Sequence, residues 1–205
     1  MKTRFTTLFC TALLCRTAFG QNNLTINFDG PPPQAPGTST LISSYTESGV
    51  LFTNLSQKFG RAGGGISGLP EDGSAYLQTG SGSAGGPISF SFLNGSHFSL
   101  LSVDLAEYST VVAGHPVTFL GIRGDGSLVT NTFNLDGVID GTGPLADFQT
   151  FSFSSEFTDL VQVDIRSQTF SMDNVLVSVP EPSIACLVIT GAVLIGLRRR
   201  QRRAG

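Results

Sequence analysis

The feature that most constrains the fold is a repeated alternation of apolar and polar residues across the middle of the chain, residues 21–178. The alternating runs are short, and Gly, Asn and Asp residues separate them. A period of two residues is typical of strands with one buried face. We therefore predict an all-β, jelly-roll-like antiparallel β-sandwich. The expected strands are residues 24–29, 49–53, 75–79, 88–92, 98–108, 116–123, 127–135, 148–153, 160–166 and 169–179.

Turn residues between these runs predict which strands pair. Asn94-Gly95 is a strong hairpin signal, so the runs before and after it are expected to pair. Gly124-Asp125-Gly126 predicts a second hairpin, and runs 148–153 and 160–166 are expected to form a third. Residues 58–74 contain many glycines and a proline, and we expect an irregular loop there.

The last expected strand changes its phase of alternation near its middle. Phe170 and Met172 share one face, whereas the later apolar positions begin at Val175. The alternation therefore slips by one residue around Asp173-Asn174, and a β-bulge is expected there. Bulges often re-aim side chains beside functional sites, which makes Asp173 a candidate site residue.

A structural calcium site is the metal-binding hypothesis that these strands support. Asp29 closes the first strand, and Asp173 lies in the last. If the two strands are neighbours, their carboxylates and nearby backbone carbonyls offer the hard oxygen ligands that Ca²⁺ prefers. The alternative is that Asp29 and Asp173 only cap a turn and a solvated strand edge. No other cofactor is predicted.

Charge and cysteine content limit the possible partners of residues 21–180. This part of the chain has four basic and fourteen acidic side chains, a net charge of −10. Such a surface repels nucleic acid and anionic lipid, so neither is expected as a partner. All three cysteines lie outside it, in the apolar segments near the two ends. No disulfide is therefore expected in the domain.

The N-terminal residues 1–20 read as a secretory signal peptide. Lys2 and Arg4 precede an apolar stretch, and small residues end the segment at Gly20. Cleavage is expected between Gly20 and Gln21. A retained N-terminal anchor is the alternative, although the apolar stretch is short for a membrane span.

The C-terminal residues 179–205 have three parts in a fixed order. Val179-Pro180-Glu181-Pro182 is followed by an apolar run, for which we predict a transmembrane helix at about 183–197. The arginines after this run are expected to stay cytoplasmic: Arg198, Arg199, Arg200, Arg202 and Arg203. A C-terminal core helix with a solvated basic tail is the alternative.

These three parts resemble the PEP-CTERM sorting signal of Gram-negative bacteria that make extracellular polysaccharide. The resemblance implies exosortase as a partner, a transient inner-membrane anchor, and delivery to the cell envelope, outer surface or extracellular matrix. Residues 21–178 would then be the exported sandwich domain. The end of the first strand, Phe28-Asp29-Gly30, and the Met172-Asp173-Asn174 stretch of the last look like the sandwich domains placed before such signals and like jelly-roll carbohydrate-binding domains.

No catalytic motif accompanies these signals. His97 and His115 lie in expected turns, and the domain has no cysteine nucleophile. We therefore expect no catalytic residues and a non-enzymatic matrix protein associated with exopolysaccharide. The alternatives are a carbohydrate-binding module, favoured by an exposed tyrosine pair on one face, and an enzyme with a carboxylate pair in a cleft. The ligand-binding residues are not predicted, and the amphipathic aromatics available are Tyr45, Tyr76 and Tyr108.

Overall fold

The computed structural model describes residues 21–54, 58–80, 87–110, 115–139 and 147–180. Residues 23–179 form one compact unit. Thirteen strands and no helix occur in the described ranges: β1 Gln21–Ile26, β2 Ser39–Ile42, β3 Ser44–Glu47, β4 Val50–Asn54, β5 Phe59–Gly63, β6 Ala75–Thr79, β7 Ile88–Phe92, β8 Ser99–Glu107, β9 Pro116–Arg123, β10 Leu128–Asn134, β11 Gln149–Ser152, β12 Leu160–Ile165 and β13 Phe170–Pro180.

The predicted signal peptide and transmembrane helix, residues 1–20 and 183–197, lie outside the described residues. Within the described ranges, no helix is long and apolar enough to cross a membrane.

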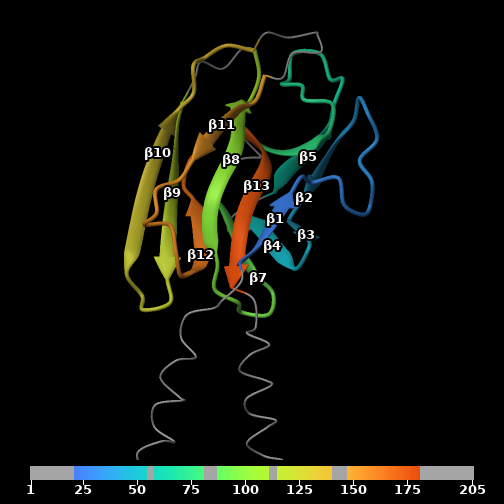
Figure 1. Cartoon of the computed structure of the whole chain (residues 1–205). Helices are drawn as coiled ribbons and strands as arrows, with labels where there is room; N and C mark the ends of the chain where they lie inside the picture. The colour runs from blue at the N-terminus through green and yellow to red at the C-terminus, as the bar shows by residue number, and fades with distance from the viewer. Residues whose placement is uncertain (1–20, 55–57, 81–86, 111–114, 140–146, 181–205) are drawn as a thin grey trace, which may run out of the picture. The chain divides into compact units, whose positions relative to one another are not determined.

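Two antiparallel sheets make up the domain, which confirms the prediction of an all-β sandwich. A seven-stranded sheet has the order β11-β8-β13-β6-β5-β2, with β1 paired to β13. A six-stranded sheet has the order β10-β9-β12-β7-β4-β3. Neighbouring strands in both orders run antiparallel. In Figure 1 the orange-red β13 runs beside the green β8 and the blue β1, so the first and last strands are neighbours, which is the condition that the calcium hypothesis set.

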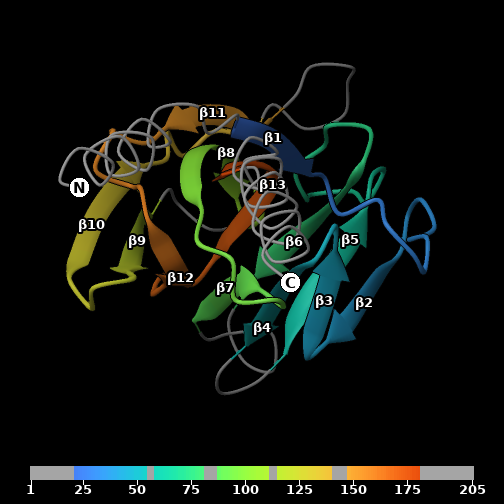
Figure 2. The same ribbon diagram turned by 60° about the horizontal axis from the view of Figure 1, so that its bottom comes forward.

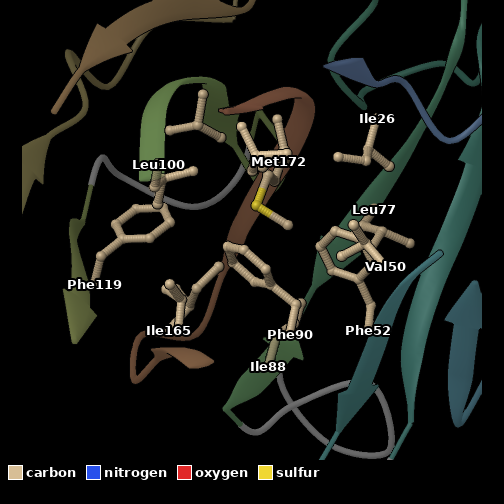
Figure 3. Close-up of a cluster of buried hydrophobic side chains, with 14 of the residues drawn as sticks. Ile26, Val50, Phe52, Leu77, Ile88, Phe90, Leu100, Phe119, Ile165 and Met172 are labelled. Atoms are coloured by element: carbon tan, nitrogen blue, oxygen red, sulfur yellow. The ribbon is translucent and has the colours of Figure 1, made fainter. Parts of the chain in front are cut away.

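The apolar core fills the space between the two sheets. It contains the inward-facing side chains of both sheets, and Figure 3 shows ten of them labelled: Ile26, Val50, Phe52, Leu77, Ile88, Phe90, Leu100, Phe119, Ile165 and Met172. Phenylalanine rings contact one another through this layer. Phe52 stacks on Phe90 with centroids 5.0 Å apart, and the edge of Phe28 meets Phe52 at 5.1 Å. Burial of these rings stabilises the fold without a disulfide.

The predicted irregular loop at 58–74 is wrong for residues 59–63, which form β5 in the seven-stranded sheet, and right for residues 64–74, which form no strand or helix. Phe59 packs in the core, and β5 pairs with β6 on one side and β2 on the other. Its glycine allows close packing: a Cβ on Gly60 would lie 2.7 Å from Gln78 Cγ. The small residues that indicated a loop therefore make room for a neighbouring side chain.

Two of the three predicted hairpins are also wrong. The Asn94-Gly95 turn forms, with Gly95 N–H bonded to Phe92 O at 3.0 Å, but β7 and β8 belong to different sheets. Likewise β11 pairs with β8, whereas β12 pairs with β7 and β9. Figure 2 shows β9, β12 and β7 together in the six-stranded sheet. Both connections cross the sandwich because large phenylalanines that follow these turns, Phe98 and Phe157, are buried in the core between the sheets.

The predicted hairpin of β9 and β10 and the predicted bulge in β13 are confirmed. Leu128 pairs with Ile122, and the register continues to Asn134 opposite Pro116. In β13 the pairing with β8 shifts between Asp173 and Leu176. Asn174 has a φ of 47°, a left-handed conformation that asparagine tolerates better than most residues.

Candidate functional site

The candidate site lies on the face of the seven-stranded sheet that points away from the core. Met172 and Leu77 are paired in the register of β13 and β6, and both side chains lie in the core. The residues that alternate with them therefore point outward. We call this set the polar face: Tyr76 and Gln78 on β6, Asp104 and Tyr108 on and just after β8, and Ser171 and Asp173 on β13.

Most of the polar face is buried although it faces away from the core. Tyr76, Ser171 and Asp173 are each 0% exposed, and Gln78 is 5% exposed. The ring of Phe148, just before β11, meets Tyr76 edge-on at 5.2 Å. Tyr108, which is partly exposed, lies against Gly80, where a Cβ would be 2.6 Å from its Cζ.

Several buried polar atoms of this face have no hydrogen-bond partner among the residues that the structure describes. They are the Tyr76 hydroxyl, Gln78 Oε1, Ser171 Oγ and Asp173 Oδ1, together with Oδ2 of the adjacent Asp72. An unsatisfied buried polar group destabilises a fold, and native proteins keep few of them. A group of five on one face therefore calls for a ligand, water or ion that completes them.

In contrast to these atoms, the carboxylate of Asp104, beside the bulge, has hydrogen-bond partners. Its carboxylate accepts from Thr150 Oγ1 at 2.6 Å and from Asn174 Nδ2 at 2.9 Å. Hydrogen bonds from Asn174 and Thr150 therefore hold Asp104 in place at the β11 side of the polar face. The atoms without a partner among the described residues lie nearer to β6.

Asp72 and Asp173 form a close carboxyl pair at the start of β6. Ser74 N donates to Asp72 Oδ1 at 2.9 Å, and Ser74 Oγ lies 2.9 Å from Asp173 Oδ2. The two side chains are also within hydrogen-bond reach of each other. Burial, followed by the hydrogen bond and the negative charge of Asp72, raises the pKa of Asp173 to about 9.

Negative charge gathers around this pair. Burial and then the charges of Asp72, Glu71 and Asp147 raise the pKa of the Tyr76 hydroxyl. The Glu71 backbone N–H donates to Asp147 Oδ2 at 2.8 Å, which joins the loop before β6 to the segment before β11. Neither Asp72 nor Asp173 forms a salt bridge in the described part of the chain.

The predicted calcium ligands Asp29 and Asp173 meet neighbouring residues but have different roles. Asp29 Oδ1 accepts from the Ala75 N–H at 2.9 Å, and Asp29 Oδ2 accepts from Asn27 Nδ2 at 3.2 Å. Asp173 bonds to Ser74, the residue before Ala75. Asp29 therefore holds the first residue of β6, and the carboxyl that pairs directly with Asp173 is Asp72.

A buried arginine supplies positive charge after the end of β1. Arg61, 3% exposed, donates to the carbonyl oxygens of Phe28, Gly30 and Pro32. Its guanidinium also lies 4.8 Å from the ring centroid of Tyr45. The backbone oxygens that follow β1 are thus bound by a guanidinium. Within the described ranges, no three His, Cys, Asp or Glu side chains are arranged to hold a metal.

His97 pairs with an aspartate at the surface of the domain. His97 Nδ1 lies 2.6 Å from Asp159 Oδ1, and both side chains are substantially exposed. In the described residues, no serine, threonine or cysteine bonds to His97, so this pair lacks the nucleophile of a catalytic triad.

The remaining predicted site residues belong to the two ends of the domain. Gln21 begins β1, and Val179 and Pro180 end β13. Gly20, Glu181 and Pro182, as well as Arg198, Arg199 and Arg200, lie outside the described residues.

Sequence reasoning missed Asp72 and the unpartnered polar face. Asp72 precedes Gly73 directly before a strand, which read as an ordinary turn. The one available signal was the alternation of Tyr76 and Gln78 with core residues in β6. A carboxyl pair of this kind can share a proton, deliver it to a bound molecule or hold a cation.

Comparison with known proteins gives structural neighbours but no family. No family model matches the chain, and no curated protein matches it. Among solved structures, a Stig cyclase from Fischerella sp. TAU covers 78% of this chain and 100% of its own, with 17% identity and a TM-score of 0.42. An apo-form cyclase from Fischerella sp. covers 78% and 98%, with 13% identity and a TM-score of 0.43. A CBM4 structure covers 77% and 86%, with 13% identity and a TM-score of 0.28.

These neighbours correct one prediction. The chain was expected not to be an enzyme, and that expectation is contradicted because two of the similar structures are cyclases. The low identities and TM-scores give no reaction and no substrate for this chain.

Proposed function

We propose that this protein is exported, sorted by exosortase through residues 179–205, and bound to polysaccharide of the envelope or matrix through its sandwich domain. The observation that carries the binding proposal is the polar face, where Tyr76 and Tyr108 lie on one side of the sheet beside unpartnered polar atoms. Localisation and sorting rest on the sequence resemblance alone.

The chemistry of the polar face suits a sugar better than a purely apolar ligand. Aromatic rings offer a flat apolar surface to the C–H face of a sugar, and carboxyl and amide oxygens accept hydrogen bonds from its hydroxyls. Tyr108 and Phe148 are the partly exposed rings at this face. They are the side chains that a glycan reaches first.

Charge narrows the class of polysaccharide. Glu71, Asp72 and Asp147 lie around Tyr76, and Arg61 is occupied by backbone carbonyls. A glycan that carries carboxylates or sulfates would be repelled here. We therefore expect a neutral glycan, or one with positively charged amino sugars.

Affinity measurements with the full chain in mild detergent test the proposal. A screen of neutral, amino and acidic glycans is expected to retain neutral or amino glycans and to exclude acidic ones. Tyr108→Ala should lower the affinity about tenfold, since it removes one stacking ring, and Tyr108→Phe should retain most of it. Leu93→Ala, a 62% exposed residue in the turn after β7, is the control and should bind as the wild type does.

Two results would contradict the binding proposal. One is a chain that retains no glycan of any class. The other is binding that Tyr108→Ala leaves unchanged, since the contact would then lie elsewhere. Sorting is tested separately by the intact mass of the envelope form, which is expected to lack Arg198, Arg199 and Arg200.

A further inference from the structure

The carboxyl pair Asp72–Asp173 has a definite gap in its hydrogen bonding. Ser74 Oγ lies 2.8 Å from Asp72 Oδ1 and 2.9 Å from Asp173 Oδ2, but a hydroxyl has only one proton to donate. Ser74 N already donates to Asp72 Oδ1, so the hydroxyl proton is needed at Asp173 Oδ2. Among the residues that the structure describes, none then donates to Asp72 Oδ2 or Asp173 Oδ1.

We propose that Asp72 and Asp173 bind a divalent cation, calcium, between their carboxyl groups. The ion would contact the two oxygens that no described residue bonds, Asp72 Oδ2 and Asp173 Oδ1. Binding would release the proton that the pair holds, and the ion would neutralise two carboxylates that form no salt bridge in the described part of the chain. The proposal does not depend on glycan binding.

A second feature of the same place points to a small ligand. The Tyr76 hydroxyl is fully buried and has no hydrogen-bond partner among the described residues. It lies near Asp72, whose negative charge is one cause of its raised pKa. Its unshared proton and lone pairs can bond to water around an ion. Tyr76 and Asp173 are both 0% exposed, so any ligand at these atoms is itself enclosed by the protein. The partly exposed Asp72 is on the side from which the ion enters.

The donor atoms favour calcium over other metals. Carboxylate and hydroxyl oxygens are hard ligands, and no His or Cys belongs to the pair, which disfavours zinc and copper. Calcium accepts six to eight oxygens in flexible geometry, so water and backbone oxygens can complete two carboxylates. Two charges give moderate affinity, and we expect a Kd of about 10⁻⁴ to 10⁻³ M, as for extracellular modules.

This assignment changes the calcium hypothesis drawn from the sequence. Asp173 stays a ligand, but Asp29 is replaced by Asp72, because both oxygens of Asp29 already accept hydrogen bonds. The bulge at Asp173 explains why a carboxyl of the last strand reaches the loop before β6.

Thermal unfolding of the full chain in mild detergent, followed by far-UV circular dichroism, tests the proposal. After treatment with EDTA, calcium at tenfold excess over Kd should raise the Tm by about 3–6 °C. Asp72→Asn and Asp173→Asn should each lose this shift. Asp125→Asn, an exposed carboxyl that accepts from Ser127 N in the β9–β10 turn, is the matched control and should keep it.

Tb³⁺, a luminescent substitute for calcium, gives a readout that does not depend on folding stability. The chain has no tryptophan and three tyrosines, so tyrosine is its sensitiser of Tb³⁺ emission. Wild type should show sensitised emission that calcium displaces. Tyr76→Phe should reduce that emission several-fold, and should lower the calcium-induced Tm shift less than Asp72→Asn or Asp173→Asn does, because it removes a contact to bound water but neither carboxyl ligand.

Two outcomes would overturn the proposal. One is a wild-type Tm that calcium does not change at millimolar concentration, with no sensitised emission. In that case the pair shares only a proton. The other is a calcium response that both Asp72→Asn and Asp173→Asn retain, which would move the ion to another site. Glycan affinity is measured independently, so loss of one property is distinguishable from loss of the other.

Discussion

The two faces of the seven-stranded sheet place alternate residues of the same strands in opposite environments. On the inward face, Met172 and Leu77 pack in an apolar core. On the outward face, Ser171 and Asp173 are just as buried but leave polar atoms without partners in the described structure. Apolar burial stabilises a fold, whereas unsatisfied polar burial weakens it. The inward face thus accounts for the stability of the fold. The buried polar atoms of the outward face are explained only if a ligand completes their hydrogen bonds.

The largest expected effect is in the inward face. Phe90→Ala removes a ring that is 1% exposed and that stacks on Phe52 at 5.0 Å. Loss of burial and the cavity left behind should lower the free energy of unfolding by about 3–5 kcal/mol. Chemical denaturation followed by circular dichroism measures it. A loss below about 1 kcal/mol would show that the core between the sheets does not carry the stability assigned to it.

Arg61 is an exception within the inward face, since it is buried and charged and donates to three backbone carbonyls. Arg61→Met keeps an unbranched stem without the guanidinium, and it leaves the carbonyls of Phe28, Gly30 and Pro32 without their donor. The free energy of unfolding should fall by about 2–4 kcal/mol, because relief from burying the charge offsets part of the lost bonds.

Arg123→Met provides the matched control for this substitution. Arg123 donates to Glu156 O at 2.7 Å from a site that is only partly buried. Its loss should change the free energy of unfolding by no more than about 1 kcal/mol. If both substitutions lower the free energy of unfolding equally, burial of the Arg61 hydrogen bonds does not increase their contribution to stability.

The inward face was also the more predictable of the two. The alternation in 116–123, 127–135 and 169–179 indicated strands because one face of each is apolar, and the phase change at Asp173 indicated the bulge. Pairing was less predictable, since the Asn94-Gly95 turn has hairpin chemistry whether or not the chain then changes sheets. β5 was missed because glycine and alanine carry no periodic signal of their own.

The outward face was hardly predictable. Asp72 and Asp173 are separated by 101 positions, and their contact depends on β6 and β13 being neighbours. The sequence marked Asp173 through the bulge but paired it with Asp29, the acid nearest to the end of the first strand. Tertiary contacts decide which carboxyl completes such a pair, and the local pattern around Asp72 is that of a turn.

The smallest expected changes in the free energy of unfolding come from two serine-to-alanine substitutions, one on each kind of site, and they differ in sign. Ser171 Oγ is fully buried on the outward face and has no partner among the described residues. Ser167 Oγ, just before β13, accepts from Thr118 N at 2.8 Å and donates to Pro116 O at 3.0 Å. Ser167→Ala should therefore lower the free energy of unfolding by about 0.5–1.5 kcal/mol. Ser171→Ala should leave it unchanged or raise it by up to about 1 kcal/mol, since it removes a desolvated hydroxyl and no bond. Denaturation of both variants in EDTA measures the difference. If Ser171→Ala destabilises the protein as much as Ser167→Ala does, its hydroxyl is satisfied in solution and the outward face is as complete as the core.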